Sequence, residues 1–228
     1  MNLNKIKYLI YGFFLTRKYG NKLQNTSNPM EKKRLRLEYA KIFFSKLNII
    51  VTIENKEKIP SKGQYLIFSN HRSILDPLAI DIILEKSTIF GLWVAKKELF
   101  DSPMLGKAVT HGGCIQLDRE EKDTKLFFSD IKEGLSNGSS ICIFPEGTRN
   151  KTNKDLLEFK NGVRIIAIKN KLSLLPIYIK SNASEVLEQA LLDNSIQREI
   201  TIVVGDIISH TDKRDLETSY RAMFNLKN

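Results

Sequence analysis

From residue 49 onward, short apolar runs alternate with stretches in which apolar residues recur every three or four positions. The short runs have the length and composition of strands and cover 49–53, 65–69, 90–95, 114–117, 140–144, 174–179 and 200–204. The helical stretches between them cover 77–85, 122–135, 162–169, 183–193 and 213–224. Strands that alternate with helices are typical of α/β proteins. The pattern therefore predicts a single α/β domain over residues 48–228, built on one mixed sheet flanked by helices.

The first 47 residues show helical periodicity. One apolar face follows the i, i+3, i+4, i+7, i+8 spacing, and its members are Ile6, Leu9, Ile10, Phe13 and Phe14. A second helix is predicted to begin at Pro29, because Asn28 suits the N-cap position and Glu31 completes a capping box. The apolar face of this second helix consists of Leu35, Tyr39, Ile42 and Phe43. We expect a two-helix hairpin over residues 1–47 that precedes the α/β domain.

Positive charge is concentrated in this hairpin. The chain has a formal net charge of +10, and residues 1–46 hold eleven basic and two acidic side chains, which gives +9. The longest apolar run, Tyr8–Leu15, is about half of the ~20 residues that span a bilayer, and no small-residue signal-peptide cleavage site follows it. We therefore expect the hairpin to lie peripherally on an anionic membrane surface. The alternative is that its apolar faces simply pack on the main domain.

Composition excludes several other classes. Hydrophobic residues make up 42% of the chain and charged residues 27%, which is the usage of a folded globular protein. No zinc-ligand spacing or aromatic RNA-binding signature accompanies the basic charge, so no nucleic-acid partner is expected. No clustered metal ligands, Walker loop or dinucleotide fingerprint occur, so neither a metal nor a redox cofactor is expected. Cys114 and Cys142 lie in apolar runs, which favours core thiols in a reducing compartment and the cytoplasmic face of the cell membrane.

Two predicted strands run directly into polar blocks, at residues 70–76 and 145–150. Ligands bind at the carboxyl ends of strands in α/β sheets. His71 and Asp76 are five residues apart, which would place them about 140° apart on one regular helix. Because Pro77 suits the first position of a helix, Asp76 is predicted as its N-cap, with His71 in the preceding loop. A carboxylate against one ring nitrogen would make His71 a general base. The alternative is a capping Asp76 beside an ordinary loop histidine.

Three further signals are interpreted as structural. Residues 134–138 match G-x-S-x-G, the nucleophile-elbow pattern of serine hydrolases, but a helical stretch precedes them and a strand follows. An elbow requires the opposite order, so a turn is predicted. His111 precedes two glycines and is interpreted as a loop histidine, and His210 has no partner pattern.

The polar blocks resemble those of a known family. Residues 70–76 (Asn-His-Arg-Ser-Ile-Leu-Asp) resemble the N-H-x-S-x-x-D block of the glycerolipid acyltransferases, whose best-known members are the 1-acylglycerol-3-phosphate acyltransferases. Residues 144–149 match the family's F-P-E-G-T-R block in every position, and residues 159–162 resemble its F-K-x-G block. Weaker similarities at 94–99, 113–119 and 175–177 follow in the family's order, so the resemblance spans about residues 49–205. Gln116 departs from the pattern, because a large apolar residue, commonly Phe, is expected there.

The resemblance implies an O-acyltransferase of phospholipid synthesis. It would move a fatty acyl group from acyl-CoA or acyl carrier protein, without a cofactor, to the free hydroxyl of 1-acyl-sn-glycerol 3-phosphate, giving phosphatidate. The implied catalytic residues are His71 and Asp76, and the implied glycerol-phosphate ligands are Glu146, Gly147, Thr148, Arg149 and Arg119. Two alternatives stay open: another lysolipid or amino-lipid acceptor on the same fold, or a non-catalytic peripheral lipid-binding protein.

Overall fold

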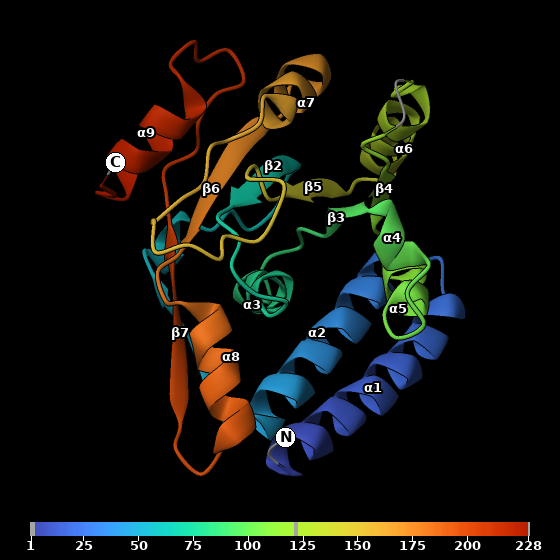
Figure 1. Ribbon diagram of the computed structural model, residues 1–228. Coiled ribbons are helices and arrows are strands. Elements are labelled where there is room, and N and C mark those ends of the chain that lie inside the picture. Colours follow the sequence, from blue (N-terminus) through green and yellow to red (C-terminus); the bar gives the residue numbers. More distant parts are fainter. Residues whose placement is uncertain (1–2, 121–122, 228) are drawn as a thin grey trace.

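The computed structural model describes residues 3–120 and 123–227, and two long helices at its N-terminus form a hairpin beside a mixed sheet (Figure 1). The helices of the hairpin are α1 (Leu3–Gln24) and α2 (Pro29–Lys46). The strands are β1 (Ile49–Glu54), β2 (Tyr65–Ser69), β3 (Gly91–Lys96), β4 (Ile115–Leu117), β5 (Ser140–Ile143), β6 (Ser173–Ile179) and β7 (Arg198–Val204). The later helices are η1 (Lys56–Lys58), α3 (Asp76–Ile83), α4 (Lys97–Phe100), α5 (Gly106–His111), α6 (Lys125–Ser136), α7 (Gly162–Asn170), α8 (Ala183–Leu192) and α9 (Leu216–Met223).

The seven strands form one sheet in the order β1-β7-β6-β2-β5-β3-β4. Neighbouring strands are parallel except β6 and β7, which are antiparallel, so the predicted mixed sheet is confirmed. Each predicted strand is present, with ends shifted by two residues at most. The short elements η1, α4 and α5 were not predicted, because three to six residues are too few to display a helical period. Lys122, where one helix was predicted to begin, lies outside the described residues.

Two hydrophobic clusters cover the two faces of the sheet. The first contains buried residues of α1, α2, α3 and α8, and the second contains buried residues of α6, α7 and α9. Figure 1 shows the same division, with α3, α8 and the hairpin on one side of the sheet. Tyr8, Ala40 and Phe44 of the hairpin belong to the first cluster, so the hairpin shares the core of the α/β domain.

Helix α1 has two apolar faces, and the predicted one is not the face that packs inward. The buried face consists of Tyr8, Leu15, Tyr19 and Leu23. In the predicted stripe, Leu9, Ile10 and Phe14 are 50%, 52% and 64% exposed. No helix among residues 3–120 and 123–227 is both long and apolar enough to cross a bilayer. Packing therefore accounts for one apolar face of α1 and leaves the other exposed.

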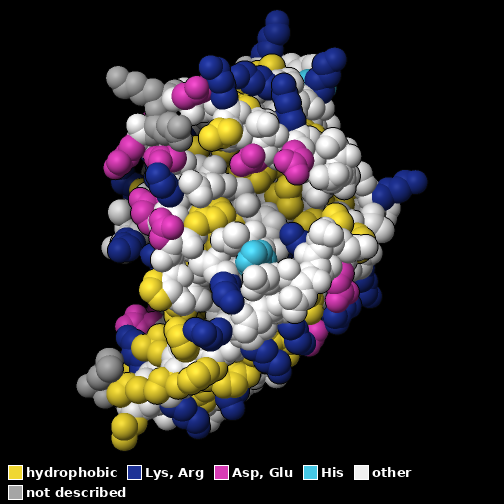
Figure 2. Space-filling view, turned by 90° about the vertical axis from the view of Figure 1, so that its right-hand side faces the viewer, with side chains coloured by type: hydrophobic (Ala, Val, Ile, Leu, Met, Phe, Trp, Pro, Cys, Tyr) yellow, Lys and Arg dark blue, Asp and Glu magenta, His cyan; other side chains and the backbone are white. Residues whose placement is uncertain are grey.

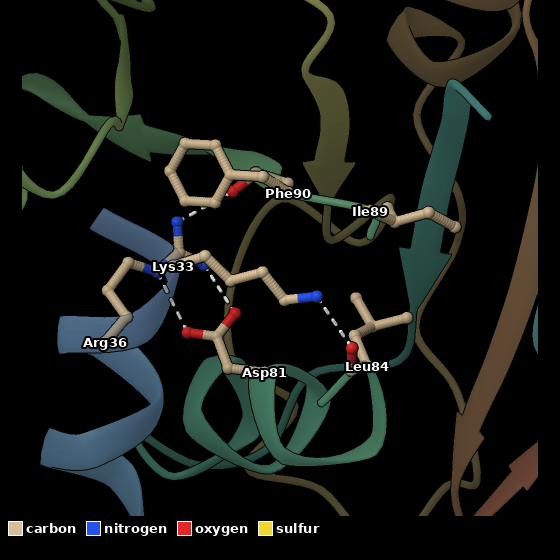
Figure 3. A pocket seen from close by; sticks show the side chains of 7 residues that line it. Lys33, Arg36, Asp81, Leu84, Ile89 and Phe90 are labelled. Carbon is tan, nitrogen blue, oxygen red and sulfur yellow. Dashed lines mark hydrogen bonds and ion pairs between the residues drawn. The ribbon is translucent and has the colours of Figure 1, made fainter. Parts of the chain in front are cut away.

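Two basic residues of α2 point into the protein and so are not available to an anionic membrane surface (Figure 3). Arg36 makes a bidentate ion pair with Asp81 of α3, with N–O distances of 2.9 and 2.5 Å, and its side chain is 11% exposed. Arg36 also donates to the carbonyl oxygens of Gly91 and Gly112. Lys33 donates to the carbonyl oxygens of Leu84 and Ser87 beyond the end of α3. These side chains join the hairpin to the α/β domain.

Candidate active site

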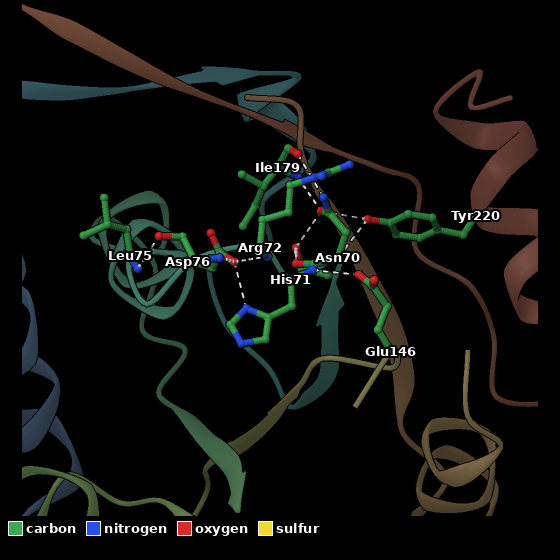
Figure 4. A network of polar contacts seen from close by, with 10 residues as sticks. Asn70, His71, Arg72, Leu75, Asp76, Glu146, Ile179 and Tyr220 are labelled. Carbon is green, nitrogen blue, oxygen red and sulfur yellow. Dashed lines mark hydrogen bonds and ion pairs between the residues drawn. The ribbon is translucent and has the colours of Figure 1, made fainter. Parts of the chain in front are cut away.

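The structure brings His71 and Asp76 together at the carboxyl end of β2 (Figure 4). His71 lies in the loop before α3, and its Nδ1 is 2.8 Å from Oδ2 of Asp76. The His71 side chain is 18% exposed, whereas Asp76 is fully buried. A buried carboxylate in this position orients the imidazole and stabilises the imidazolium that forms when the second ring nitrogen accepts a proton.

Asp76 was predicted as the N-cap of the helix, and this prediction is wrong in detail. Asp76 is the first residue of α3, and Leu75 before it already has helical backbone angles. The carboxylate turns back to the loop, where Oδ2 also accepts from the backbone N–H groups of Arg72 and Ser73, at 2.6 and 2.7 Å. Three donors therefore converge on one oxygen. These three hydrogen bonds hold both the His71 loop and the Asp76 carboxylate in place.

Two aromatic rings form a stack behind the imidazole. The ring of Phe144 lies 3.9 Å from that of His71, centroid to centroid, and is tilted by 6° from it. Trp93 of β3 also stacks on Phe144, with ring centroids 4.8 Å apart and 21° between the planes. The stack covers one face of the imidazole and limits its rotation. Trp93 could not be identified from the sequence, because nothing in a strand marks which aromatic residue will contact a loop from another strand.

Glu146 was implied as a substrate ligand, but in the structure it binds the backbone. Its Oε1 accepts from the N–H of His71 at 2.8 Å and its Oε2 accepts from the N–H of Leu157 at 2.9 Å. The side chain is buried, and this burial raises the pKa of the carboxyl to about 7, although both hydrogen bonds act in the opposite direction. Glu146 therefore helps to hold the His71 loop in place.

The remaining residues of the block form an exposed basic corner. Gly147 has a φ of +69°, in the left-handed region that favours glycine, and its carbonyl oxygen accepts from Arg119 Nη2. Thr148, Arg149 and Arg119 are exposed. Within residues 3–120 and 123–227, Arg149 makes no hydrogen bond or ion pair, so its guanidinium fork is free to bind an anion. Arg119 comes from the end of β4, so tertiary structure brings the two arginines to the same corner.

The loop that contains His71 and the segment after β5 are tied to each other. The N–H of Asn150 donates to the carbonyl oxygen of His71 at 2.6 Å. Arg72 donates to the carbonyl oxygens of Thr152 and Lys154. These hydrogen bonds fix the two loops relative to each other.

The other signals of the sequence lie outside this site. Residues 134–136 end helix α6, and only residues 137–138 form the predicted turn before β5, so the order of elements is the reverse of a nucleophile elbow. The Ser136 hydroxyl donates to the carbonyl oxygen of Glu133 at 2.8 Å. His111 is the last residue of α5 and not a loop residue as predicted. Cys142 is buried and Cys114 is partly buried, and both are free thiols. Burial raises the pKa of Cys114 to about 11, which makes it a poor nucleophile.

Comparisons with known proteins show which family and which fold the chain shares. A family model described as Acyltransferase matches residues 50–180. A 1-acyl-sn-glycerol-3-phosphate acyltransferase of Helicobacter pylori is 39% identical over 128 residues, which is 55% of this chain. The alpha form of the same enzyme from Mus musculus is 31% identical over 160 residues, 69% of this chain. The chain spans about half the length of these relatives, 53% in each case. The crystal structure of the 1-acyl-sn-glycerophosphate acyltransferase of Thermotoga maritima superposes with a TM-score of 0.71 at 20% identity, over 98% of this chain and 91% of that one.

Proposed function

Because the chain belongs to the acyltransferase family, we propose that it transfers a fatty acyl group from a thioester to the free hydroxyl of 1-acyl-sn-glycerol 3-phosphate, giving phosphatidate. The observation that carries the proposal is the His71–Asp76 pair, with 2.8 Å between Nδ1 and Oδ2, at the edge of the sheet where Arg149 is free. The names of the relatives support this acceptor.

The chemistry requires no protein nucleophile. His71 Nε2 accepts the proton of the acceptor hydroxyl as its oxygen attacks the thioester carbonyl carbon. The tetrahedral intermediate then collapses, the C–S bond breaks, and the imidazolium returns the proton to the departing thiolate. Asp76 stabilises the imidazolium between these steps. The donor is acyl-CoA or an acyl carrier protein, and we propose no cofactor.

The basic corner would bind the phosphate monoester of the acceptor. Arg149 offers a bidentate fork, and Arg119 adds a second positive charge beside Gly147. The Thr148 hydroxyl is exposed next to them. An acceptor bound here by its phosphate would present its free hydroxyl to the imidazole of His71, which lies at the same edge of the sheet.

An assay with purified protein tests the proposed function. We would offer two donors, acyl-CoA and the acyl thioester of acyl carrier protein, each labelled in the acyl chain, with a panel of lysolipids in mixed micelles. The product is identified by mass. Phosphatidate from lysophosphatidate is the expected product. If the protein acylates only another lysolipid or an amino-lipid, the proposed acceptor is wrong and that lipid is the acceptor. If the protein binds lipid but acylates no acceptor, it is a non-catalytic lipid-binding protein.

Arg149→Lys is expected to raise KM for lysophosphatidate by about 10-fold, because a point charge replaces a bidentate fork that is worth about 1.5–3 kcal/mol. A lysolipid whose phosphate carries a headgroup should suffer a smaller loss, since it presents fewer free oxygens. Initial rates with both acceptors measure the difference. Arg214→Lys is the matched control, because its side chain is 76% exposed and lies in neither proposed binding surface, and both KM values should stay unchanged. Equal losses on the two acceptors would contradict recognition of a phosphate monoester.

We propose that the outward face of α1 rests on the cytoplasmic surface of the cell membrane as a peripheral contact. Its exposed members Leu3, Ile10 and Phe14 lie near the exposed basic residues Arg17 and Lys18. Figure 2 shows hydrophobic side chains gathered along the lower edge of this face of the molecule, with Lys and Arg side chains beside them. Apolar residues flanked by cations suit the boundary between acyl chains and anionic headgroups.

Ile10→Ser combined with Phe14→Ser is expected to weaken binding to anionic vesicles several-fold, mainly in the component that survives high salt. Arg17→Gln combined with Lys18→Gln should instead weaken the salt-sensitive component. Vesicle sedimentation at low and high salt separates the two. The matched control is Ile165→Ser with Ile168→Ser, which removes apolar side chains of similar exposure from α7. If all three variants bind vesicles equally well, the proposed membrane contact is wrong and α1 has a purely structural role.

A further inference from the structure

Helix α9 lies outside residues 50–180, the segment matched by the family model, yet it contacts both loops of the candidate active site. It follows β7 near the C-terminus and packs on the sheet face opposite the hairpin (Figure 1). Two of its side chains, Tyr220 and Glu217, make hydrogen bonds to backbone atoms of these loops.

Tyr220 is bonded to the residue that precedes the catalytic histidine. Its hydroxyl accepts from the backbone N–H of Asn70 at 3.3 Å and donates to the carbonyl oxygen of Ile177 at 2.6 Å. Figure 4 shows the ring reaching from α9 to Asn70. Tyr220 is fully buried, and this burial raises the pKa of its hydroxyl well above the usual range. The hydroxyl therefore stays protonated and keeps its donor role.

Asn70 is itself a link between strands. Its side-chain amide donates to the carbonyl oxygen of Ile179 at 3.0 Å and accepts from the N–H of Ile179 at 2.8 Å. The backbone pairing of β2 with β6 ends one residue earlier, at Ser69 and Ile177. Tyr220 and Asn70 therefore hold the chain at the point where β2 gives way to the His71 loop.

Glu217 makes the corresponding contact with the second loop. Its Oε2 accepts from the backbone N–H of Phe159 at 2.8 Å, and its Oε1 pairs with Arg221 one turn later at 2.8 Å. Phe159 follows Leu157, whose N–H is bonded to Glu146. One short helix thus reaches the ends of the two segments that carry His71 and Arg149.

We propose that Tyr220 and Glu217 are positioning residues for acyl transfer, and that α9 sets the distance between the His71 loop and the basic corner. This proposal rests on the proposed function, and it assigns α9 a role in positioning the active-site loops. Neither residue touches the reacting atoms; each acts through a backbone hydrogen bond to a loop that does. A small displacement of a catalytic group can cost a large factor in rate, which makes such bonds consequential.

Tyr220→Phe tests the first bond, because it removes one oxygen and keeps the ring that packs on Phe68 and Phe159. We expect kcat to fall about 10-fold with little change in KM, and exchange of the Asn70 amide proton to accelerate about 2- to 10-fold. The control is Tyr178→Phe in the same aromatic cluster. The Tyr178 hydroxyl makes no hydrogen bond within the described part of the chain, so neither readout should change.

The two readouts separate the possible failures. If wild-type protein turns over no acceptor, the proposed function fails, but faster exchange at Asn70 alone would still support the positioning contact. If kcat falls only as far as the folded fraction falls, and exchange at Asn70 rises no more than across the whole core, Tyr220 is a packing residue and the proposal is wrong. Wild-type kcat in Tyr220→Phe would also overturn it.

Glu217→Ala provides a second test that does not disturb the core, because the side chain is 23% exposed. We expect faster exchange at Phe159 and a KM for lysophosphatidate raised several-fold, since the segment bearing Arg149 loses an anchor. Arg221→Ala is the matched control: it removes the ion pair to Glu217 but leaves the bond to Phe159 in place. Equal effects of the two variants, or no effect of Glu217→Ala, would contradict the proposal even if Tyr220→Phe failed to fold.

Discussion

His71→Ala is expected to lower kcat by about 10²–10⁴-fold, the loss typical of removing a general base. The fold should survive, because the backbone bonds of His71 to Glu146 and Asn150 do not involve the imidazole. The measurement is the single-turnover rate of acyl transfer to lysophosphatidate, with the melting temperature recorded for each variant.

Two other histidines provide the control for this experiment. His111 ends α5 and His210 follows β7, and within the described residues neither is hydrogen-bonded to His71 or Asp76. His111→Ala and His210→Ala should keep the wild-type rate within about twofold, as expected for residues that transfer no proton in the reaction. A His71→Ala variant as active as these two would exclude the proposed mechanism.

Arg36→Met is expected to destabilise the protein by about 3–5 kcal/mol, the usual cost of leaving one partner of a buried ion pair uncompensated. Asp81 would keep its carboxylate at 14% exposure without the guanidinium, and the carbonyl oxygens of Gly91 and Gly112 would lose their donor. Denaturant unfolding measures the change in the free energy of unfolding.

The controls for this variant use the same helix and the same contact. Arg34→Met removes an arginine that is 58% exposed and pairs with Glu31 and Glu38, so its effect should be far smaller. The double variant Arg36→Met with Asp81→Met removes both charges and should recover most of the lost stability. A single Arg36→Met variant no less stable than Arg34→Met would show that the buried pair does not hold the hairpin to α3.

Regular elements and the order of the polar blocks could be predicted from the sequence. The strand from Tyr65 to Ser69 and the helix start at Pro29 depend on spacing between near neighbours, which the sequence displays directly. The pairing of His71 with Asp76 was also predictable, because the two residues are separated by one short loop and a helix start. Local periodicity and local chain reversal need no knowledge of the rest of the fold.

The roles of individual side chains within those blocks required the tertiary structure. Whether the face of α1 with Phe14 or the face with Leu15 turns inward depends on which neighbour the helix meets, and both faces are apolar. Arg36 is one of eleven basic residues in the hairpin, and its sequence context does not show that it pairs with Asp81, 45 residues away. Tyr220 and Asn70 are 150 residues apart, and sequence alone gives no sign that they touch. Contacts of this kind arise from the order of strands in the sheet, because that order decides which distant segments end side by side.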